Sequence, residues 1–206
     1  MAALDAVLYE KFIIESTDGK KTVDLKEGVV FFSYFENVFS PHLTAKVQIS
    51  NTGNTVEGED GVMTSVYNGL PLIGGERVII KISGNSATNK GLDFSDSPEK
   101  YFYVSSITNI LIDAEREAFT LNLISREALT NETVRVGRKF PSSQKISDSV
   151  RDILKKYVKT EKELIINETE NPYGFIGNLK KPFSIITWLA AKSVSSSKGS
   201  STGFLF

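Results

Sequence analysis

Residues 10–131 read almost entirely as β-strands and turns, and this pattern limits the folds that the chain can adopt. Residues 43–50 alternate strictly between apolar and polar side chains, which is typical of a half-exposed strand. Residues 101–112 and 118–125 predict a long hairpin across the turn 113–116, with Phe119, Leu121 and Leu123 on one face. The pattern predicts an antiparallel β-barrel or sandwich.

Other segments of the same region define its strands and turns. Residues 11–16 and 21–25 predict a tight hairpin, because Gly19 between them tolerates a positive φ. Residues 29–35 are apolar on both alternating faces, so we expect water to be excluded from both sides of this strand, with one side facing a partner subunit.

The remaining part of this region combines one strand with two irregular segments. Residues 51–75 contain many glycines and Pro71, which predicts an excursion away from the sheet with a short helical turn within 61–68. Residues 77–83 predict a strand, and residues 84–98 predict a long exposed loop.

The pattern changes after Pro141. Apolar residues at helical spacing predict an amphipathic helix over 144–157, capped by Ser142 or Ser143. Residues 164–166 favour a short strand, residues 171–174 a turn, and Pro182 the first turn of a second helix. The chain is therefore expected to divide into a β-barrel, residues 1–135, and a smaller α/β region, residues 136–206.

The last residues carry a separate expectation. Residues 195–202 are rich in serine and predict a flexible stretch, after which Phe204, Leu205 and Phe206 begin a strand pattern without completing it. We expect the reading frame to continue beyond them, so that the α/β region is truncated here.

The composition argues against several classes of function. The 24 basic and 25 acidic residues give a net charge of −1, which does not support a general attraction to nucleic acid or anionic membranes. The absence of cysteine removes disulfides, zinc-thiolate sites and thiol nucleophiles, and weakly favours assembly in a reducing cytoplasm. No signal-peptide pattern is present, and no apolar run reaches the roughly 20 residues of a membrane-spanning helix.

Several side chains could be proposed for chemistry, and for each a structural role is favoured. His42 is the single histidine, so a triad or a histidine-based metal site would need unusual partners. The acidic residues Glu57, Glu59 and Asp60 do not have the spacing of an EF-hand loop. Asp93 and Asp96 lie in a predicted flexible loop, which seldom fixes the carboxylate separation that glycoside hydrolysis requires.

Three further patterns could indicate binding sites. Thr88 and Lys90 do not have the order found in a phosphate-binding loop, so no nucleotide site is predicted. Arg135, Arg138 and Lys139 could meet phosphates or an acidic partner, but a solvated linker face is favoured. Trp188, at helical spacing with apolar neighbours, is interpreted as core. The sequence therefore predicts no catalytic, cofactor-binding or metal-binding residues, and no enzyme.

Several stretches together resemble one protein family. Residues 10–15, 51–55, 68–80 and 28–45, which opens Gly-Val-Val-Phe-Phe-Ser, resemble the baseplate central hub proteins of T-even-like myoviruses, particularly those of marine cyanophages. Residues 125–136, the helix from Gln144 and residues 182–190 are similar to the same family. The likeness spans nearly the whole chain but includes no catalytic signature.

The resemblance implies a structural protein of the virion. Hub subunits of this family form a trimeric ring that joins the central spike to the tail tube, and two tube-type β-barrels per subunit match the sixfold tube. The chain would then contribute one barrel, and a second would lie beyond Phe206. The implied partners are two further copies of the chain, the spike, the tail tube and neighbouring baseplate proteins, assembled in the host cytoplasm. DNA would pass through the channel without specific binding.

Two alternatives stay open from the sequence. The spike of a related contractile injection machine or of a type VI secretion system shares this architecture, and a neighbouring capsid gene would argue for a phage. A glycan hydrolase on a β-sandwich is the other alternative, and it predicts that substitution of Asp93 and Asp96 abolishes turnover.

Overall fold

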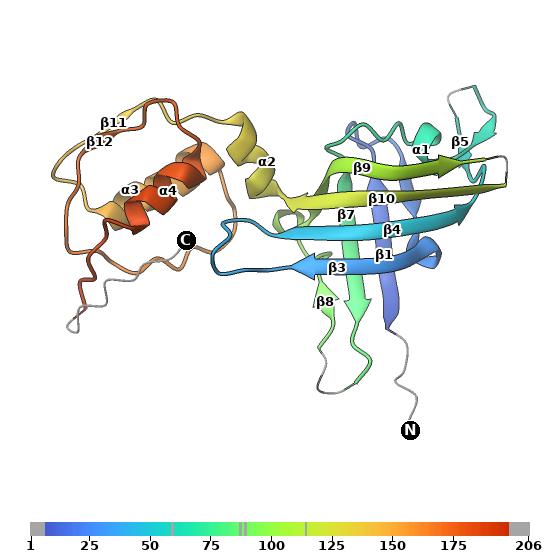
Figure 1. Cartoon of the computed structure of the whole chain (residues 1–206), viewed down its shortest axis with the longest axis horizontal. Coiled ribbons are helices and arrows are strands. Elements are labelled where there is room, and N and C mark those ends of the chain that lie inside the picture. Colours follow the sequence, from blue (N-terminus) through green and yellow to red (C-terminus); the bar gives the residue numbers. More distant parts are fainter. Residues whose placement is uncertain (1–6, 59, 87, 89, 114, 198–206) are drawn as a thin grey trace. The chain divides into compact units, whose positions relative to one another are not determined.

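The computed structural model describes residues 7–58, 60–86, 88, 90–113 and 115–197 (Figure 1). Contacts divide the chain into two compact units. Residues within Met1–Phe35 and Thr44–Arg126 form the first, which we call the β unit, and residues within Glu36–Leu43 and Glu127–Phe206 form the second, which we call the helical unit. The backbone therefore crosses between the units after residues 35, 43 and 126.

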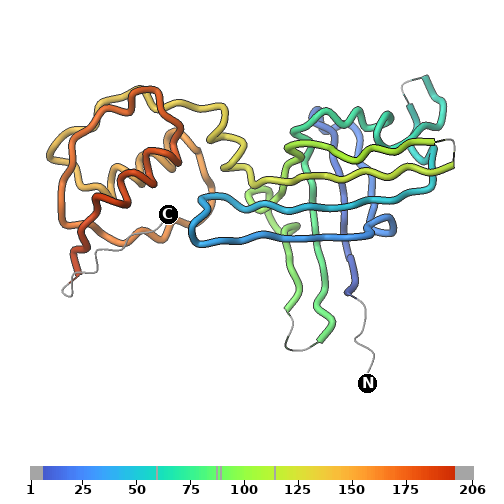
Figure 2. Tube along the Cα trace, in the orientation of Figure 1, coloured from blue at the N-terminus to red at the C-terminus, as the bar shows by residue number. Residues whose placement is uncertain are grey.

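The β unit is an antiparallel sheet that curls as half a barrel (Figures 1 and 2). Its strand order is β2-β1-β7-β9-β10-β4-β3, and β8 pairs with β7 off this path. The strands are β1 (Leu8–Glu15), β2 (Thr22–Asp24), β3 (Val29–Phe35), β4 (Thr44–Thr52), β7 (Arg77–Ser83), β8 (Leu92–Asp93), β9 (Phe102–Ile112) and β10 (Arg116–Ser125). The predicted mainly β fold with a smaller helical part is confirmed.

The core of the β unit comes from alternate residues of these strands, as the period of two requires. The predicted shared face of Phe119, Leu121 and Leu123 is confirmed, since all three are fully buried. β4 alternates as expected, with Ala45, Val47 and Ile49 buried and their neighbours exposed. Other strands add Phe12, Ile14, Val78, Ile80, Ile82, Phe102 and Val104. Burial of each large apolar side chain contributes roughly 1.5–3 kcal/mol.

Residues between β4 and β7 leave the sheet as predicted. This excursion contains β5 (Val56–Glu57) and β6 (Met63–Thr64), which pair with each other, and the one-turn helix α1 (Val66–Gly69). The Oγ of Ser65 caps α1 by accepting from the N–H of Asn68 at 3.3 Å. Because Val66, Leu70 and Leu72 are buried, the excursion is a packed part of the unit.

The segment predicted as a long exposed loop, residues 84–98, contains a strand that the sequence did not indicate. In this strand, β8, Asp93 pairs with Lys81 and Leu92 with Ile82. Gly91 permits the close approach, because a Cβ at that position would lie 2.0 Å from the carbonyl oxygen of Ile82. Short 3-10 helices η1 (Lys26–Gly28) and η2 (Pro98–Lys100) connect other strands.

The helical unit contains α2 (Arg126–Thr133), which begins at the last residue of the β unit, and β11 (Lys139–Phe140), α3 (Ile146–Ile153), the π-helical turn η3 (Leu154–Val158), β12 (Phe175–Ile176) and α4 (Pro182–Ala190). β11 and β12 form a two-stranded antiparallel sheet. The core of the unit consists of Val136, Phe140, Ile146, Ile153, Leu154, Val158, Phe183, Ile185, Ile186 and Leu189.

Both helices expected after Pro141 are found, and Pro182 occupies the first turn of the second. The predicted serine N-cap is wrong: Lys145 is the N-cap residue, and the N–H of Ser147 donates instead to Oγ1 of Thr169 at 3.0 Å. The strand predicted at 164–166 is also wrong, because those residues form no regular element.

Helix α2 was not predicted, because its inward face is polar. Glu127 and Asn131 are buried along it and bind other parts of the unit, so no apolar period marks the helix. Ser195 forms a bridge with Thr169. The predictions for residues 198–202 and for the ending Phe204-Leu205-Phe206 lie outside the described residues.

Candidate assembly surfaces

Strand β3 is one end of the sheet, and it exposes aromatic side chains on its outer face. Phe31 and Phe35 are 51% and 55% exposed and lie opposite Gln48 and Thr44 of β4. On the inner face Tyr34 contacts the rings of Phe94 and Phe102. The strand is apolar on both faces as predicted, but in this chain water reaches the outer one. An apolar strand at a sheet edge is a surface that other chains can cover.

A second apolar surface lies at the tip of the β9–β10 hairpin. Ile110, Leu111 and Ile112 are exposed there. Asn109, which precedes them, has a positive φ of 53°, and the pairing register shifts next to it, as at a β-bulge. The bulge redirects the last residues of β9, so the hairpin presents three large apolar side chains to solvent.

The excursion between β4 and β7 is held by two buried carboxylates. Glu117 of β10 accepts from the N–H groups of Val66 and Tyr67 at 3.0 and 3.3 Å and from the amide of Asn51 at 3.1 Å. It thereby binds free backbone donors at the start of α1. Glu76, just before β7, accepts from the N–H groups of Ile73 and Gly74 at 2.6 and 3.0 Å.

The sequence analysis did not predict a role for either carboxylate, although the alternation of each with apolar residues indicates that it is buried. Glu117 is in alternating register with Phe119, Leu121 and Leu123, and Glu76 with Val78, Ile80 and Ile82, so both belong to the buried face. A carboxylate on a buried face needs several hydrogen-bond donors. The sequence therefore required donors near both residues, and the excursion supplies them.

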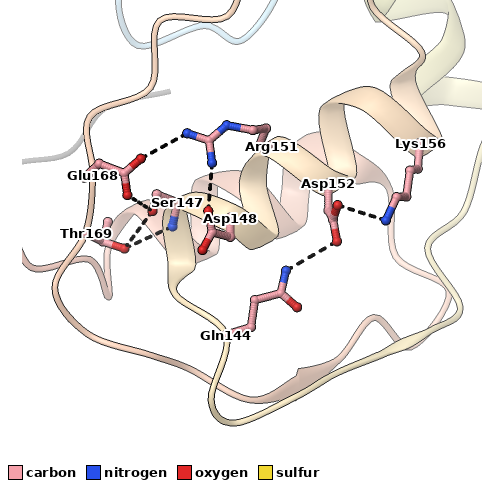
Figure 3. A network of polar contacts seen from close by, with 8 residues as sticks. All are labelled: Gln144, Ser147, Asp148, Arg151, Asp152, Lys156, Glu168 and Thr169. Atoms are coloured by element: carbon pink, nitrogen blue, oxygen red, sulfur yellow. Dashed lines mark hydrogen bonds and ion pairs between the residues drawn. The ribbon is translucent and has the colours of Figure 1, made fainter.

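The polar groups along α3 in the helical unit form an exposed network (Figure 3). Arg151 bridges Asp148 at 2.7 Å and Glu168 at 3.2 Å. Asp152 contacts Lys156 at 2.9 Å and the amide of Gln144 at 3.3 Å. Only Ser147 and Thr169 in this network are buried. The arrangement ties α3 to residues 168–169 but encloses no cavity that the structure describes.

The predicted basic cluster has structural partners. Arg138 pairs with Asp152 at 3.1 Å and lies over the Phe140 ring, 4.4 Å from its centroid. Arg135 donates to the carbonyl oxygens of Glu132 and Val134, at the end of α2. Lys139 is exposed. Two of the three cations therefore stabilise the helical unit itself.

Trp188 is not a core residue, so that prediction is wrong. It is 41% exposed on α4, and its ring makes edge-to-face contacts with Tyr173 and Phe175 at 5.5 and 5.7 Å between centroids. His42 lies in the same unit and lines a groove with Trp188. The Nδ1 atom of His42 is buried and has no hydrogen-bond partner among the described residues, so no orienting carboxylate holds the ring as in a triad.

The two carboxylates considered for glycoside hydrolysis, Asp93 and Asp96, lie at the surface. Asp93 is exposed, and hydrogen bonds from the backbone and side chain of Ser95 lower its pKa. Asp96 is also exposed, and the hydrogen bond from Lys100 at 2.7 Å lowers its pKa. A general acid at neutral pH needs a raised pKa instead. The exposure and the lowered pKa values of these two side chains therefore argue against catalysis by them.

The other candidate sites also find ordinary roles. Glu57 lies in β5, Asp60 accepts from the N–H of Val62 at 3.1 Å, and Glu59 lies outside the described residues. Within the described ranges no group of three potential metal ligands is found. Lys90 and Thr88 precede β8 and not a helix. No helix in the described part of the chain is long and apolar enough to span a membrane.

Comparisons with known proteins give structural matches. The sequence matches no protein-family model, and a search of curated proteins gives no match. The structure is similar to the 43 kDa tail protein of prophage MuSo2 from Shewanella oneidensis, with a TM-score of 0.57 and 11% identity, over 97% of this chain and 52% of that chain. This likeness shows that the chain shares its fold with about half of that tail protein.

Two further structures give lower scores. The tail protein from Neisseria meningitidis MC58 has a TM-score of 0.46 and 8% identity, over 95% of this chain and 49% of that chain. The c3393 protein of E. coli, a component of the type VI secretion system, has a TM-score of 0.43 and 9% identity, over 93% of this chain and 41% of that chain. This chain thus spans about half the length of the solved proteins it matches or less.

Proposed function

We propose that this chain is a structural subunit of a phage tail baseplate and belongs to the central hub that adapts a trimeric spike to the sixfold tail tube. The observation that carries the proposal is the fold shared with the MuSo2 tail protein over 97% of the chain. The resemblance of residues 10–15, 28–45 and 182–190 to hub proteins supports the finer assignment to the hub.

The surfaces of the β unit support an assembling subunit. The outer face of β3 exposes Phe31 and Phe35 at the end of an open sheet, and the β9–β10 tip exposes a second apolar group. Apolar surface of this kind is buried when subunits of an obligate oligomer meet. In the proposed assembly three copies of the chain form a ring around a channel in the virion tail, after assembly in the host cytoplasm.

The charge of the chain suits a channel that DNA crosses without being bound. The net charge is −1, so the chain has no excess of cations with which to retain phosphates. The proposed role is mechanical and not enzymatic. The carboxylates of Asp93 and Asp96, which the alternative of a glycan hydrolase would use, are exposed and have lowered pKa values.

The proposal is tested by the native mass of the full reading frame, measured by light scattering with and without co-expressed spike protein. The expected result is a trimer that takes up three spike chains. Phe31→Asp with Phe35→Asp places charges on the outer face of β3 and is expected to reduce the trimer to monomer. Ile73→Asp, at an apolar position of the excursion that is 81% exposed, is the control and leaves the mass unchanged.

A persistent monomer that ignores the spike protein would count against the hub assignment. If the variant with both β3 substitutions is still a trimer, the hub assignment stands, but β3 is not part of the trimer interface. Far-ultraviolet circular dichroism of each variant separates a lost interface from a lost fold.

A further inference from the structure

A groove on the helical unit is lined by residues other than those of the β-unit surfaces that the hub proposal uses. Two hollows of about 540 and 110 Å³ lie on this unit, and Ser184 and Trp188 of α4 belong to the walls of both. The larger hollow reaches Pro41 and His42, and the smaller one reaches Ile176 of β12. The two hollows lie on either side of Ser184 and Trp188, and we call them together the α4 groove.

The groove is lined by a partly exposed aromatic ring. Ile185, Ile186 and Leu189 are buried in the core of the unit, whereas Trp188, at the border of this face of α4, is 41% exposed. Tyr173 and Phe175 hold its ring in place by edge-to-face contacts. Ile176, in the other wall, is 57% exposed. A rigid, half-exposed tryptophan beside an aliphatic side chain is a typical anchor point for a protein partner.

The charges around the groove are predominantly positive. Lys180 lines it, the Nζ of Lys192 lies 5.1 Å from the Trp188 ring centroid, and Lys139 is the cross-strand partner of Ile176. None of these three lysines pairs with a carboxylate in the part of the chain that the structure describes. Glu132, the one acidic residue in the lining, is bound by Lys181. An occupant that brings carboxylates would therefore meet uncompensated cations.

We propose that this groove binds a short acidic segment of a partner protein, with an aliphatic or aromatic side chain packed against Trp188 and flanking Asp or Glu side chains beside Lys139, Lys180 and Lys192. The apolar walls of the groove bind the aliphatic or aromatic side chain of the segment, and the lysines favour negatively charged residues next to it. This inference concerns the helical unit and does not depend on trimer formation by the β unit.

The test selects displayed random peptides of about twelve residues on the full protein, with counter-selection on a Ser184→Glu variant. The enriched peptides are expected to contain an apolar residue flanked by Asp or Glu. Trp188 is the single tryptophan of the chain, so its fluorescence reports directly on binding of a selected, tryptophan-free peptide. Its emission is expected to shift and saturate during the titration.

Ser184→Lys is the matched control, because both substitutions place a long side chain at the same exposed position. Ser184→Glu is expected to weaken binding of the selected peptide at least about tenfold, and Ser184→Lys to preserve or strengthen it. Position 184 lies in the first turn of α4, where Glu favours the helix and Lys does not. If binding were lost through damage to the fold, Ser184→Lys would therefore bind the peptide more weakly than Ser184→Glu.

Two results would overturn the proposal. One is a selection without enrichment over Ser184→Glu, or with enriched peptides that are basic or uncharged. The other is Trp188 emission that changes with protein concentration alone, together with a doubled native mass that Ser184→Glu abolishes. That result would identify a second copy of this chain as the occupant.

Discussion

The two units bind their carboxylates in different ways. In the β unit Glu76 and Glu117 are fully buried, and they accept hydrogen bonds from backbone N–H groups and one side-chain amide. In the helical unit Asp148 and Asp152 of α3 and Glu168 beside it are partly exposed and pair with arginine and lysine (Figure 3). A buried carboxylate fixes a segment of backbone in one place, whereas an exposed ion pair can rearrange in water.

Loss of the Glu117 carboxylate should give the largest effect on stability. Glu117→Ala leaves the N–H groups of Val66 and Tyr67 and the amide of Asn51 without their acceptor, and we expect the free energy of unfolding to fall by about 3 kcal/mol. Urea unfolding followed by circular dichroism measures the change. Glu115→Gln, at an exposed position on the same hairpin, should change the free energy by less than about 0.5 kcal/mol. Equal effects at both positions would contradict the comparison.

Glu76→Ala should destabilise the β unit by about 2 kcal/mol, because it frees the N–H groups of Ile73 and Gly74 at the other end of the excursion. Both carboxylates hold the same segment, so the double variant with Glu117→Ala should lose less than the sum of the single losses. Hydrogen exchange of Val66 and Tyr67 amides in each single variant checks whether the excursion opens as one piece. Strict additivity would show two independent attachments.

Asp152 should give a smaller, pH-dependent effect. Burial by itself raises the pKa of Asp152, but the hydrogen bonds from Lys156 and Gln144 and the nearby charge of Arg138 outweigh it, and the pKa lies below the ordinary value of 3.8. Stability from a carboxyl group with a lowered pKa is fully present above that ordinary value and is lost as the pH falls through the lowered one. At pH 7, Asp152→Asn should therefore cost up to about 1 kcal/mol.

The pH dependence of the difference is the sharper measurement. The gap in urea-unfolding free energy between the native chain and Asp152→Asn should close as the pH is lowered below 3.8. A gap that stays constant from neutral to acid pH would show that the variant disturbs packing and not an ionised carboxylate.

Arg151→Ala should have the smallest effect. Its two ion pairs, to Asp148 and Glu168, are partly exposed, so the loss should be at most about 0.5 kcal/mol at low salt and should disappear in high salt. Thermal unfolding at two salt concentrations measures it. A loss comparable with that of Glu117→Ala would remove the distinction between the two kinds of carboxylate binding.

The sequence predicted those elements whose apolar period is visible along the chain. β4, β7, the β9–β10 hairpin and α4 follow periods of two or of 3.6 and were found where expected. Strand β8 and helix α2 were missed, because β8 is two residues long within a polar segment and α2 buries Glu127 and Asn131. Both elements are held by residues distant along the chain. Ile82 pairs with β8, and the N–H of Phe183 donates to Asn131 of α2.

The candidate surfaces were predictable to a lesser degree. Apolar residues on both faces of 29–35 indicated a covered strand, and the structure shows which face is exposed to solvent. Trp188 followed the helical period of α4 closely enough to be taken as core. Its exposure depends on Tyr173 and Phe175, which hold the ring at the surface, and no local pattern reports that contact.

The route of the backbone between the units has a mechanical consequence. Because residues 36–43 belong to the helical unit while 1–35 and 44–126 belong to the β unit, three covalent links join the units. A tensile load between the units is shared among these three links. If a protease cuts the chain after residue 126, residues 36–43 still attach the two pieces, through their noncovalent packing in the helical unit. In single-molecule pulling, residues 36–43 must therefore detach from the helical unit before the two pieces can separate.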